Sequence, residues 1–164
     1  MRQLADPADK QGPRPCFLCA AAACKAGSDE ATWRHVLVSD ERGVLLLNRY
    51  PYANGHLLAA CVDHVGDLTS LAAAARGGLM ELATVAQRLL ETAVNPQGFN
   101  VGINVGRCAG AGVPGHIHMH VVPRWHGDTN FMPLFGQVRV IPQALEESFA
   151  SLVAALDKVG SATD

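Results

Sequence analysis

Residues 116–122 of the chain alternate between two kinds of side chain, a pattern typical of a half-buried β-strand. Since a strand points every second side chain to the same face, one phase predicts a core-facing row of apolar residues. That row is Ile117, Met119 and Val121. The other phase predicts a row of imidazole rings on the opposite face, formed by His116, His118 and His120.

Other segments carry strand patterns as well. Two short apolar runs, residues 44–47 and 57–62, flank the turn-rich segment 48–55 and predict neighbouring antiparallel strands. Residues 99–105 alternate and predict a half-buried strand, which the glycine-rich loop 106–115 joins to the histidine strand. We therefore expect these last two strands to pair antiparallel, with their polar faces on the same side. The apolar phase of residues 99–105 is Phe99, Val101, Ile103 and Val105.

Two segments show apolar residues in steps of three and four, which is typical of a helix with one buried face. The first pattern begins at Leu71 and predicts a helix over residues 79–93, because the Gly77-Gly78 pair weakens any earlier turn. The second predicts a helix over residues 143–158, with Pro142 suited to its first turn. The sequence thus predicts an α+β fold with an antiparallel meandering sheet, one long helix and a C-terminal helix.

Composition sets the expected domain organisation. Residues 1–15 are polar and rich in proline, and they predict a flexible N-terminal tail. The chain of 164 residues has the length of one ordinary domain. We expect residues 16–158 to form that single domain and residues 159–164 to form a C-terminal tail.

Charge and hydropathy narrow the classes of partner. The net charge is -2, which gives no basic field for a nucleic acid polymer or an anionic membrane surface. No apolar run is long enough for a membrane span or a secretory signal, and an odd count of 5 cysteines argues against a disulfide framework. These features predict a cytoplasmic protein with free thiols. A charged fraction of only 17% suggests apolar surface covered in a homodimer.

The row of histidines admits three interpretations. Strand histidines can be structural, neutral imidazoles can bind zinc or copper, and an imidazole can attack phosphorus while its neighbours donate hydrogen bonds to phosphate oxygens. The loop 106–115 favours phosphoryl chemistry, because glycines let backbone N–H groups converge on an anion. Asn104, at the start of that loop, adds an amide suited to a phosphate oxygen.

Cys16 and Cys19 form a CxxC motif, which fits either a redox pair or half of a metal site. Thiol oxidoreductases place this motif at the start of a helix in a βαβ unit, whereas here it follows the proline-rich N-terminal segment. The context therefore favours a metal. Tetrahedral zinc needs two more ligands, which spacing alone does not supply.

The histidine row and its surroundings resemble the histidine-triad superfamily of nucleotidyl hydrolases and transferases. Residues 116–122 match the motif of that family, residues 48–68 resemble its N-terminal strand pair, and residues 98–130 resemble the branch that contains diadenosine tetraphosphate phosphorylases. The resemblance covers roughly residues 16–156. It implies an enzyme that binds a purine nucleotide or a dinucleoside polyphosphate.

The resemblance also implies roles for individual residues. His118 would attack the α-phosphorus to form a transient nucleotidyl-histidine, and His120 and His56 would lie at the phosphate. Asn48 would contact the ribose hydroxyls. Asn104 would cradle the phosphate together with the loop backbone at Gly110, Ala111, Gly112 and Val113. Many hydrolases of the family have a glutamine and a serine or threonine just before the first histidine, whereas this chain has Gly112, Val113 and Pro114.

Distant relatives, the galactose-1-phosphate uridylyltransferases, bind zinc with such a CxxC, a histidine and the first histidine of the triad. The resemblance therefore implies a structural zinc site in this chain, made by Cys16, Cys19, His64 and His116. Two alternatives to nucleotidyl transfer to water stay open. In the first, phosphate or a sugar phosphate accepts the nucleotidyl group. In the second, the protein is a zinc-stabilised nucleotide-binding module with little turnover.

Overall fold

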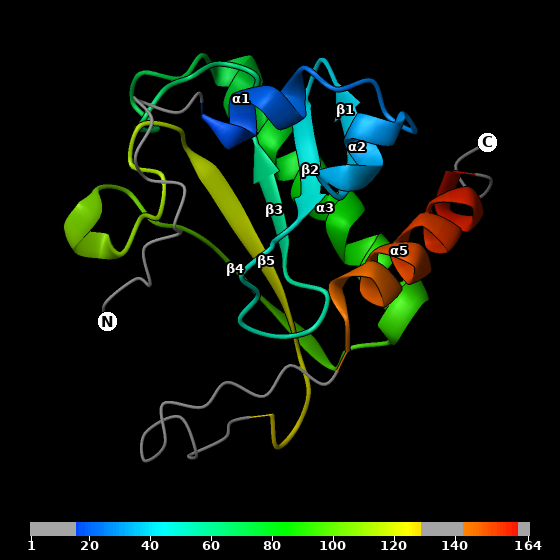
Figure 1. The fold of residues 1–164 in the computed structure, drawn as a ribbon. Helices are drawn as coiled ribbons and strands as arrows, with labels where there is room; N and C mark the ends of the chain where they lie inside the picture. The colour runs from blue at the N-terminus through cyan, green and yellow to red at the C-terminus, as the bar shows by residue number, and fades with distance from the viewer. Residues whose placement is uncertain (1–15, 129–142, 161–164) are drawn as a thin grey trace, which may run out of the picture.

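The computed structural model describes residues 16–128 and 143–160, which form a five-stranded antiparallel sheet with helices on both faces (Figure 1). The strand order is β1-β2-β3-β5-β4. Each strand pairs antiparallel with its neighbour in the sheet. The strands are β1 (Val36–Asp40), β2 (Gly43–Leu47), β3 (Leu57–Ala60), β4 (Gly98–Ile103) and β5 (His118–Arg124).

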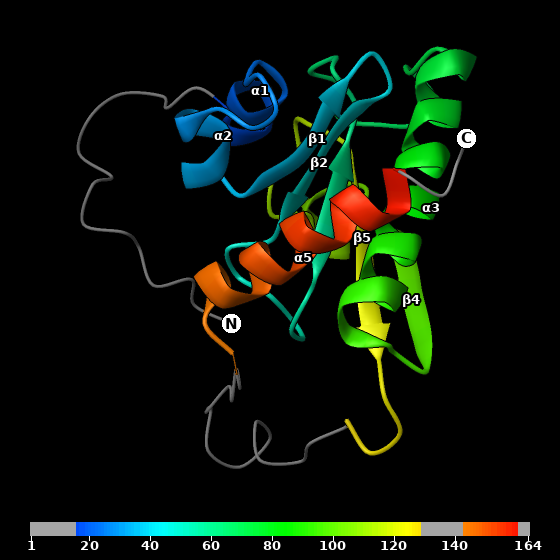
Figure 2. The same ribbon diagram turned by 90° about the vertical axis from the view of Figure 1, so that its right-hand side faces the viewer.

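Helices α3 (Ala73–Val94) and α5 (Leu145–Gly160) pack on one face of the sheet, as Figure 2 shows. The short helices α1 (Phe17–Ala22) and α2 (Asp29–Trp33) lie on the other side. The α+β class, the antiparallel sheet, the long helix and the C-terminal helix are confirmed as predicted. Pro142 lies outside the described residues.

Several predicted boundaries are wrong. Helix α3 begins at Ala73 rather than residue 79, so the pair Gly77-Gly78 lies inside the helix. Gly78 lies against the backbone of Arg42, where an added Cβ would stand 2.6 Å from the Arg42 carbonyl oxygen. A glycine that weakens the isolated helix is thus required by its packing. Helix α5 extends to Gly160, and α1, α2 and β1 were not predicted at all.

The strand that carries the histidines is shorter than its pattern suggested. It starts at His118, because the N–H of His116 donates to the carbonyl of Val113 in a turn that precedes the strand. Strand β4 lies at the sheet edge, and Val101 and Val105 are 43% and 44% exposed. Val101 lies opposite the core residue Val121 and so shares its face, but the edge position leaves it exposed, and the expectation that these two valines are buried was therefore wrong.

Two hydrophobic clusters cover opposite faces of the sheet. The larger one joins the sheet to α3 and α5 and contains the predicted core row of the histidine segment, Ile117, Met119 and Val121. The smaller one joins α1 and α2 to the first three strands only. The half of that second face formed by β5 and β4 therefore stays clear of both short helices.

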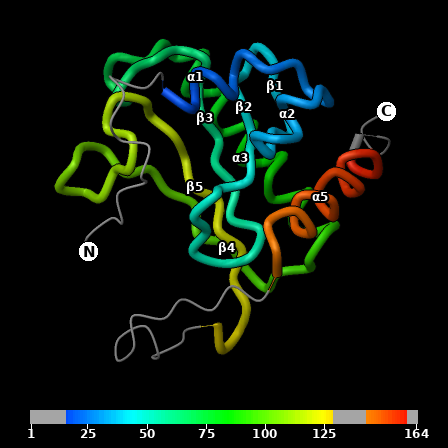
Figure 3. The backbone as a smooth tube through the Cα atoms, in the orientation of Figure 1, coloured from blue at the N-terminus to red at the C-terminus, as the bar shows by residue number. Residues whose placement is uncertain are grey.

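Pairing in the sheet places the histidines on this second face. Directly opposite residues of an antiparallel pair share a face, and Ala60 and Leu58, both in the smaller cluster, lie opposite His118 and His120. Figure 3 shows that the long connection from β4 to β5 extends away from the sheet beside this face. In the part of the chain that the structure describes, no helix has the length and hydropathy needed to span a membrane.

Candidate active site and metal centre

His118, at the start of β5, has one ring nitrogen fixed by the backbone. Its Nδ1 lies 2.8 Å from the carbonyl oxygen of His116, and the side chain is only 4% exposed. Because a carbonyl only accepts hydrogen bonds, Nδ1 must carry the proton. A neutral His118 therefore keeps its lone pair on Nε2, which is the form needed for a nucleophile.

His120 and His56 form a second, connected pair. The backbone N–H of Tyr52 donates to Nδ1 of His56 at 3.0 Å, and the amide nitrogen of Asn48 lies 3.2 Å from the same atom. Nδ1 of a neutral His56 is thus the acceptor, and its Nε2 carries the proton. That nitrogen lies 2.9 Å from Nδ1 of His120, so the hydrogen bond runs from His56 to His120.

The same chain of hydrogen bonds determines which nitrogen of His120 donates. With Nδ1 accepting from His56, a neutral His120 carries its proton on Nε2. Burial, and then the nearby His118, lower the pKa of His120 below the usual histidine value, which keeps its ring neutral at pH 7. The strand therefore presents two different groups side by side: a lone pair on His118 and an N–H donor on His120. Their ring centroids are 5.1 Å apart.

A cavity of about 380 Å³ lies beside His120. Tyr52 forms one wall, with its ring stacked 5.8 Å from that of His120. Gly102 lies directly opposite His120 on β4, and a Cβ added to Gly102 would meet no atom within 4 Å. The absence of a side chain at this position keeps the cavity open next to His120. Other lining residues include Asn100, Asn104, Val122, Arg124 and Asp128.

The remaining predicted nucleotide contacts lie around this face. Asn104 lines the cavity, whereas Asn48 holds the nearby His56 and accepts a hydrogen bond from the Tyr50 N–H at 3.0 Å. In the loop, the N–H groups of Gly110 and Ala111 donate to the carbonyls of Arg107 and Gly106. Val113 packs against the smaller hydrophobic cluster, and Gly112 is exposed. Ligand contacts by Asn48 and by Gly110, Ala111, Gly112 and Val113 stay predictions.

The four predicted metal ligands meet in one cluster. The ligand atoms of Cys16, Cys19, His64 and His116 all lie within 4.8 Å of one another. Nδ1 of His116 is 3.4 Å from each sulfur, and Nδ1 of His64 is 3.2 Å from Sγ of Cys19. A tetrahedral zinc ion with two thiolates and two imidazoles has sulfur–nitrogen separations of about 3.5 Å. The donor set and its spacing therefore fit zinc.

His116 links this cluster to the nucleophile. Its Nε2–H donates a hydrogen bond to the carbonyl oxygen of Cys61 at 2.9 Å, which leaves the lone pair of Nδ1 for a metal. Its own carbonyl oxygen holds Nδ1 of His118. The side chain of one fully buried residue thus belongs to the metal cluster, while its main chain orients the nucleophile.

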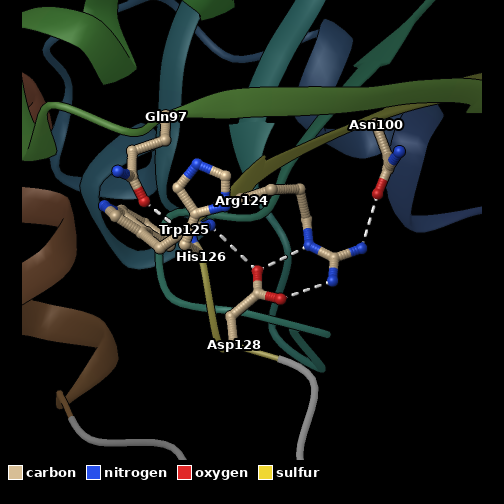
Figure 4. A network of polar contacts seen from close by, with 6 residues as sticks. All are labelled: Gln97, Asn100, Arg124, Trp125, His126 and Asp128. Atoms are coloured by element: carbon tan, nitrogen blue, oxygen red, sulfur yellow. Dashed lines mark hydrogen bonds and ion pairs between the residues drawn. The ribbon is translucent and has the colours of Figure 1, made fainter.

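Sequence analysis missed a polar network (Figure 4), three members of which, Asn100, Arg124 and Asp128, line the cavity. Arg124 donates from Nε and Nη2 to the two carboxylate oxygens of Asp128, each at 2.6 Å, and from Nη1 to Oδ1 of Asn100 at 2.6 Å. A signal was present, because Arg124 follows His118 and His120 in the same alternating phase of β5. Sequence analysis also missed Tyr52, the cavity wall beside His120, because no pattern around it indicated a functional position.

Comparison with known proteins gives the family. The sequence profile of the HIT domain matches residues 30–127. The chain belongs to the HIT domain family. The structure agrees: a Zn-bound histidine triad family protein from Mycobacterium smegmatis superposes with a TM-score of 0.70 at 29% identity, and the match covers 90% of this HIT protein and 96% of that chain.

Two further relatives of this HIT protein carry names that describe an activity. The AP-4-A phosphorylase of Mycobacterium tuberculosis is 39% identical over 120 residues, which cover 68% of this chain and 62% of that protein. The match thus spans less than two thirds of that relative. The diadenosine triphosphate hydrolase of Plasmodium falciparum gives a TM-score of 0.61 at 17% identity over 80% of each chain, which shows the shared fold alone.

Proposed function

We propose that this HIT protein transfers a nucleotidyl group from a dinucleoside polyphosphate, through a covalent intermediate on His118. One observation carries the proposal: the hydrogen-bond pattern on β5 gives His118 a free lone pair on Nε2 and His120 an N–H donor, side by side on the strand, and His120 lines the cavity. A nucleophile beside a donor that stabilises the developing charge is the arrangement that phosphoryl transfer requires.

In the first step, Nε2 of His118 attacks the α-phosphorus of the substrate. A nitrogen–phosphorus bond forms, the bond from that phosphorus to the bridging oxygen breaks, and its electron pair leaves with the departing nucleotide. The attacking ring becomes positively charged, and the carbonyl of His116 stabilises it by accepting from Nδ1–H at 2.8 Å. His120 donates from Nε2 to a phosphate oxygen, with His56 holding its orientation.

In the second step, an oxygen of the acceptor attacks the same phosphorus. The nitrogen–phosphorus bond breaks and its electron pair returns to Nε2 of His118, which restores the enzyme. Resemblance to the Mycobacterium tuberculosis AP-4-A phosphorylase supports diadenosine tetraphosphate as the substrate and inorganic phosphate as the acceptor. The acceptor could instead be water or a sugar phosphate, which would change the product and leave the first step the same.

The products distinguish these acceptors directly. With diadenosine tetraphosphate and inorganic phosphate, we expect ATP and ADP, because the phosphate oxygen ends bonded to the adenylyl phosphorus. Without phosphate, transfer to water gives ATP and AMP. Chromatography of the products after incubation with and without phosphate checks this prediction. AMP as the sole second product in both incubations would contradict phosphorolysis, and it would establish a hydrolase.

His56 gives a second prediction. We expect His56→Ala to lower kcat by roughly 10- to 100-fold with little change in KM, because it removes the partner that fixes the donor nitrogen of His120. His56→Gln should retain more activity, since a glutamine amide donates from nearly the same position. Steady-state kinetics of both variants test this. Equal loss in the two variants would show that His56 acts by packing rather than by orienting His120.

We also propose that Cys16, Cys19, His64 and His116 bind zinc. Their donor chemistry and spacing support it, as does the similarity to the Zn-bound protein from Mycobacterium smegmatis. Bound zinc would supply structural cross-linking, joining the start of α1 to His64 and to the turn that precedes β5. The homodimer, the cytoplasmic location and the lack of a nucleic acid partner stay predictions. The exposed Val101 on the edge strand β4 supports pairing with a second copy.

A further inference from the structure

We propose that Arg124, held by Asp128 and Asn100, binds the phosphates of the leaving nucleotide that lie beyond the attacked phosphorus, and so sets the preferred length of the polyphosphate chain. This inference rests on the proposed function. It concerns the network of Figure 4, which the two transfer steps do not use. All three side chains line the same cavity as His120.

The position of Arg124 suits a distal part of the substrate. Arg124 lies on the same face of β5 as His118 and His120, because the strand points every second side chain to one side. Four residues of extended strand separate Arg124 from His120, which is about 13 Å between their backbones. The guanidinium group donates to Asn100, which lies opposite Val122, so it extends back along the strand toward His120. A substrate bound at His118 and His120 would therefore bring phosphates beyond the attacked one to the guanidinium group.

Arg124 keeps donors for a ligand while its orientation is fixed. A guanidinium group has five N–H bonds, and three are engaged with partners among the described residues: two with Asp128 and one with Asn100. One N–H on Nη1 and one on Nη2 remain to donate. Since the side chain is already ordered by a bidentate ion pair, little rotamer entropy is lost when a phosphate binds.

The hydrogen bond to Arg124 also orients Asn100 so that its NH2 group can donate to a ligand. Arginine only donates, so the carboxamide oxygen of Asn100 must face Arg124, and its NH2 group is left to donate, as the geometry in Figure 4 shows. Asn104 adds a further amide along the same cavity wall. This row of donors matches a ligand rich in acceptor oxygens, which a polyphosphate is.

The ion pair keeps this arrangement at neutral pH. Hydrogen bonds from Arg124, and then from the Trp125 N–H, hold the pKa of Asp128 at about 2, so the carboxylate is ionised well below pH 7. A purely structural role is the alternative. Trp125 donates to Asp128 at 3.0 Å and His126 donates to Gln97 at 2.6 Å, so the network also fastens the turn after β5. The experiment must separate these two roles.

The test compares substrates of different length in two variants and one matched control. For Arg124→Ala, we expect KM for diadenosine tetraphosphate to rise by about 10- to 100-fold, the range for a lost charge-assisted hydrogen bond. KM for diadenosine triphosphate should rise by less than about threefold, and the calorimetric affinity for AMP should not change. Arg124→Lys keeps the positive charge but loses the planar guanidinium group with its parallel N–H donors. It should show an intermediate rise in KM for diadenosine tetraphosphate.

Arg42→Ala is the control, because Arg42 forms the same kind of ion pair with Asp40, at 2.6 Å, away from the cavity. It should leave all three ligands unaffected. Equal weakening of tetraphosphate, triphosphate and AMP in Arg124→Ala would show a structural role and overturn the inference, as would no change for any of them. If the wild type processes both dinucleotides and Arg124→Ala has the same KM for each, the inference is rejected while the proposed function stands. A wild type that binds none of the three ligands would contradict the proposed function as well.

Discussion

Replacing His118 with alanine should lower turnover of diadenosine tetraphosphate by at least about a thousandfold, while AMP affinity stays within about threefold of the wild type. The large effect on turnover follows because the nucleophile itself is lost. The small effect on affinity follows because His120, Asn104 and the cavity wall stay in place. Steady-state kinetics and calorimetric titration with AMP measure the two quantities.

His126→Ala is the matched control for this variant. His126 is an exposed histidine in the turn after β5, and in the described part of the chain its one hydrogen bond is from its backbone N–H to the side-chain oxygen of Gln97. Its replacement should leave turnover unchanged. Retained turnover in His118→Ala would remove the proposed nucleophile. A wild type that binds AMP but processes no dinucleotide would instead favour a nucleotide-binding module with little turnover.

Removing the metal should cost the protein much of its stability. We expect Cys19→Ser to abolish stoichiometric zinc and to lower the free energy of unfolding by roughly 4 kcal/mol, or Tm by about 10 °C in a chain of this length. The reason is that Cys16 and Cys19 lie at the start of α1, and zinc would join this helix to His64 and His116. Metal analysis of the purified protein and thermal unfolding measure both effects.

The same variant should also lose activity, since the backbone of His116 holds Nδ1 of His118. Cys108→Ser is the control, because Cys108 is exposed and lies outside the metal cluster. It should match the wild type in zinc content and Tm. A wild type purified without zinc, together with an unchanged Tm in Cys19→Ser, would contradict the metal site.

Local sequence patterns predicted the row of histidines on one face of the strand, but they could not assign a separate role to each histidine. Alternation along residues 116–122 correctly placed Ile117, Met119 and Val121 in the core. It could not show that His116 turns toward two cysteines about a hundred positions earlier, because that contact depends on where α1 packs. Resemblance to the family supplied this pairing, and the cluster of ligand atoms confirms it.

Other features depended on packing that the pattern does not contain. The pair Gly77-Gly78 argued against an early start of α3, yet the close contact with Arg42 requires a glycine at position 78. The apolar phase of β4 predicted a buried face, but the edge position leaves Val101 exposed. Arg124 was overlooked although it continues the phase of the histidines, since alternation alone does not show that a charged residue near a strand end lines a cavity.

The covalent intermediate on His118 is tested most directly by mass spectrometry of the enzyme quenched in alkali during turnover of diadenosine tetraphosphate. We predict one added adenylyl group in the wild type, located on the peptide that contains His118 and absent from His118→Ala. An adenylyl group on any other residue, or turnover by a wild type that never carries the group, would contradict the proposed mechanism.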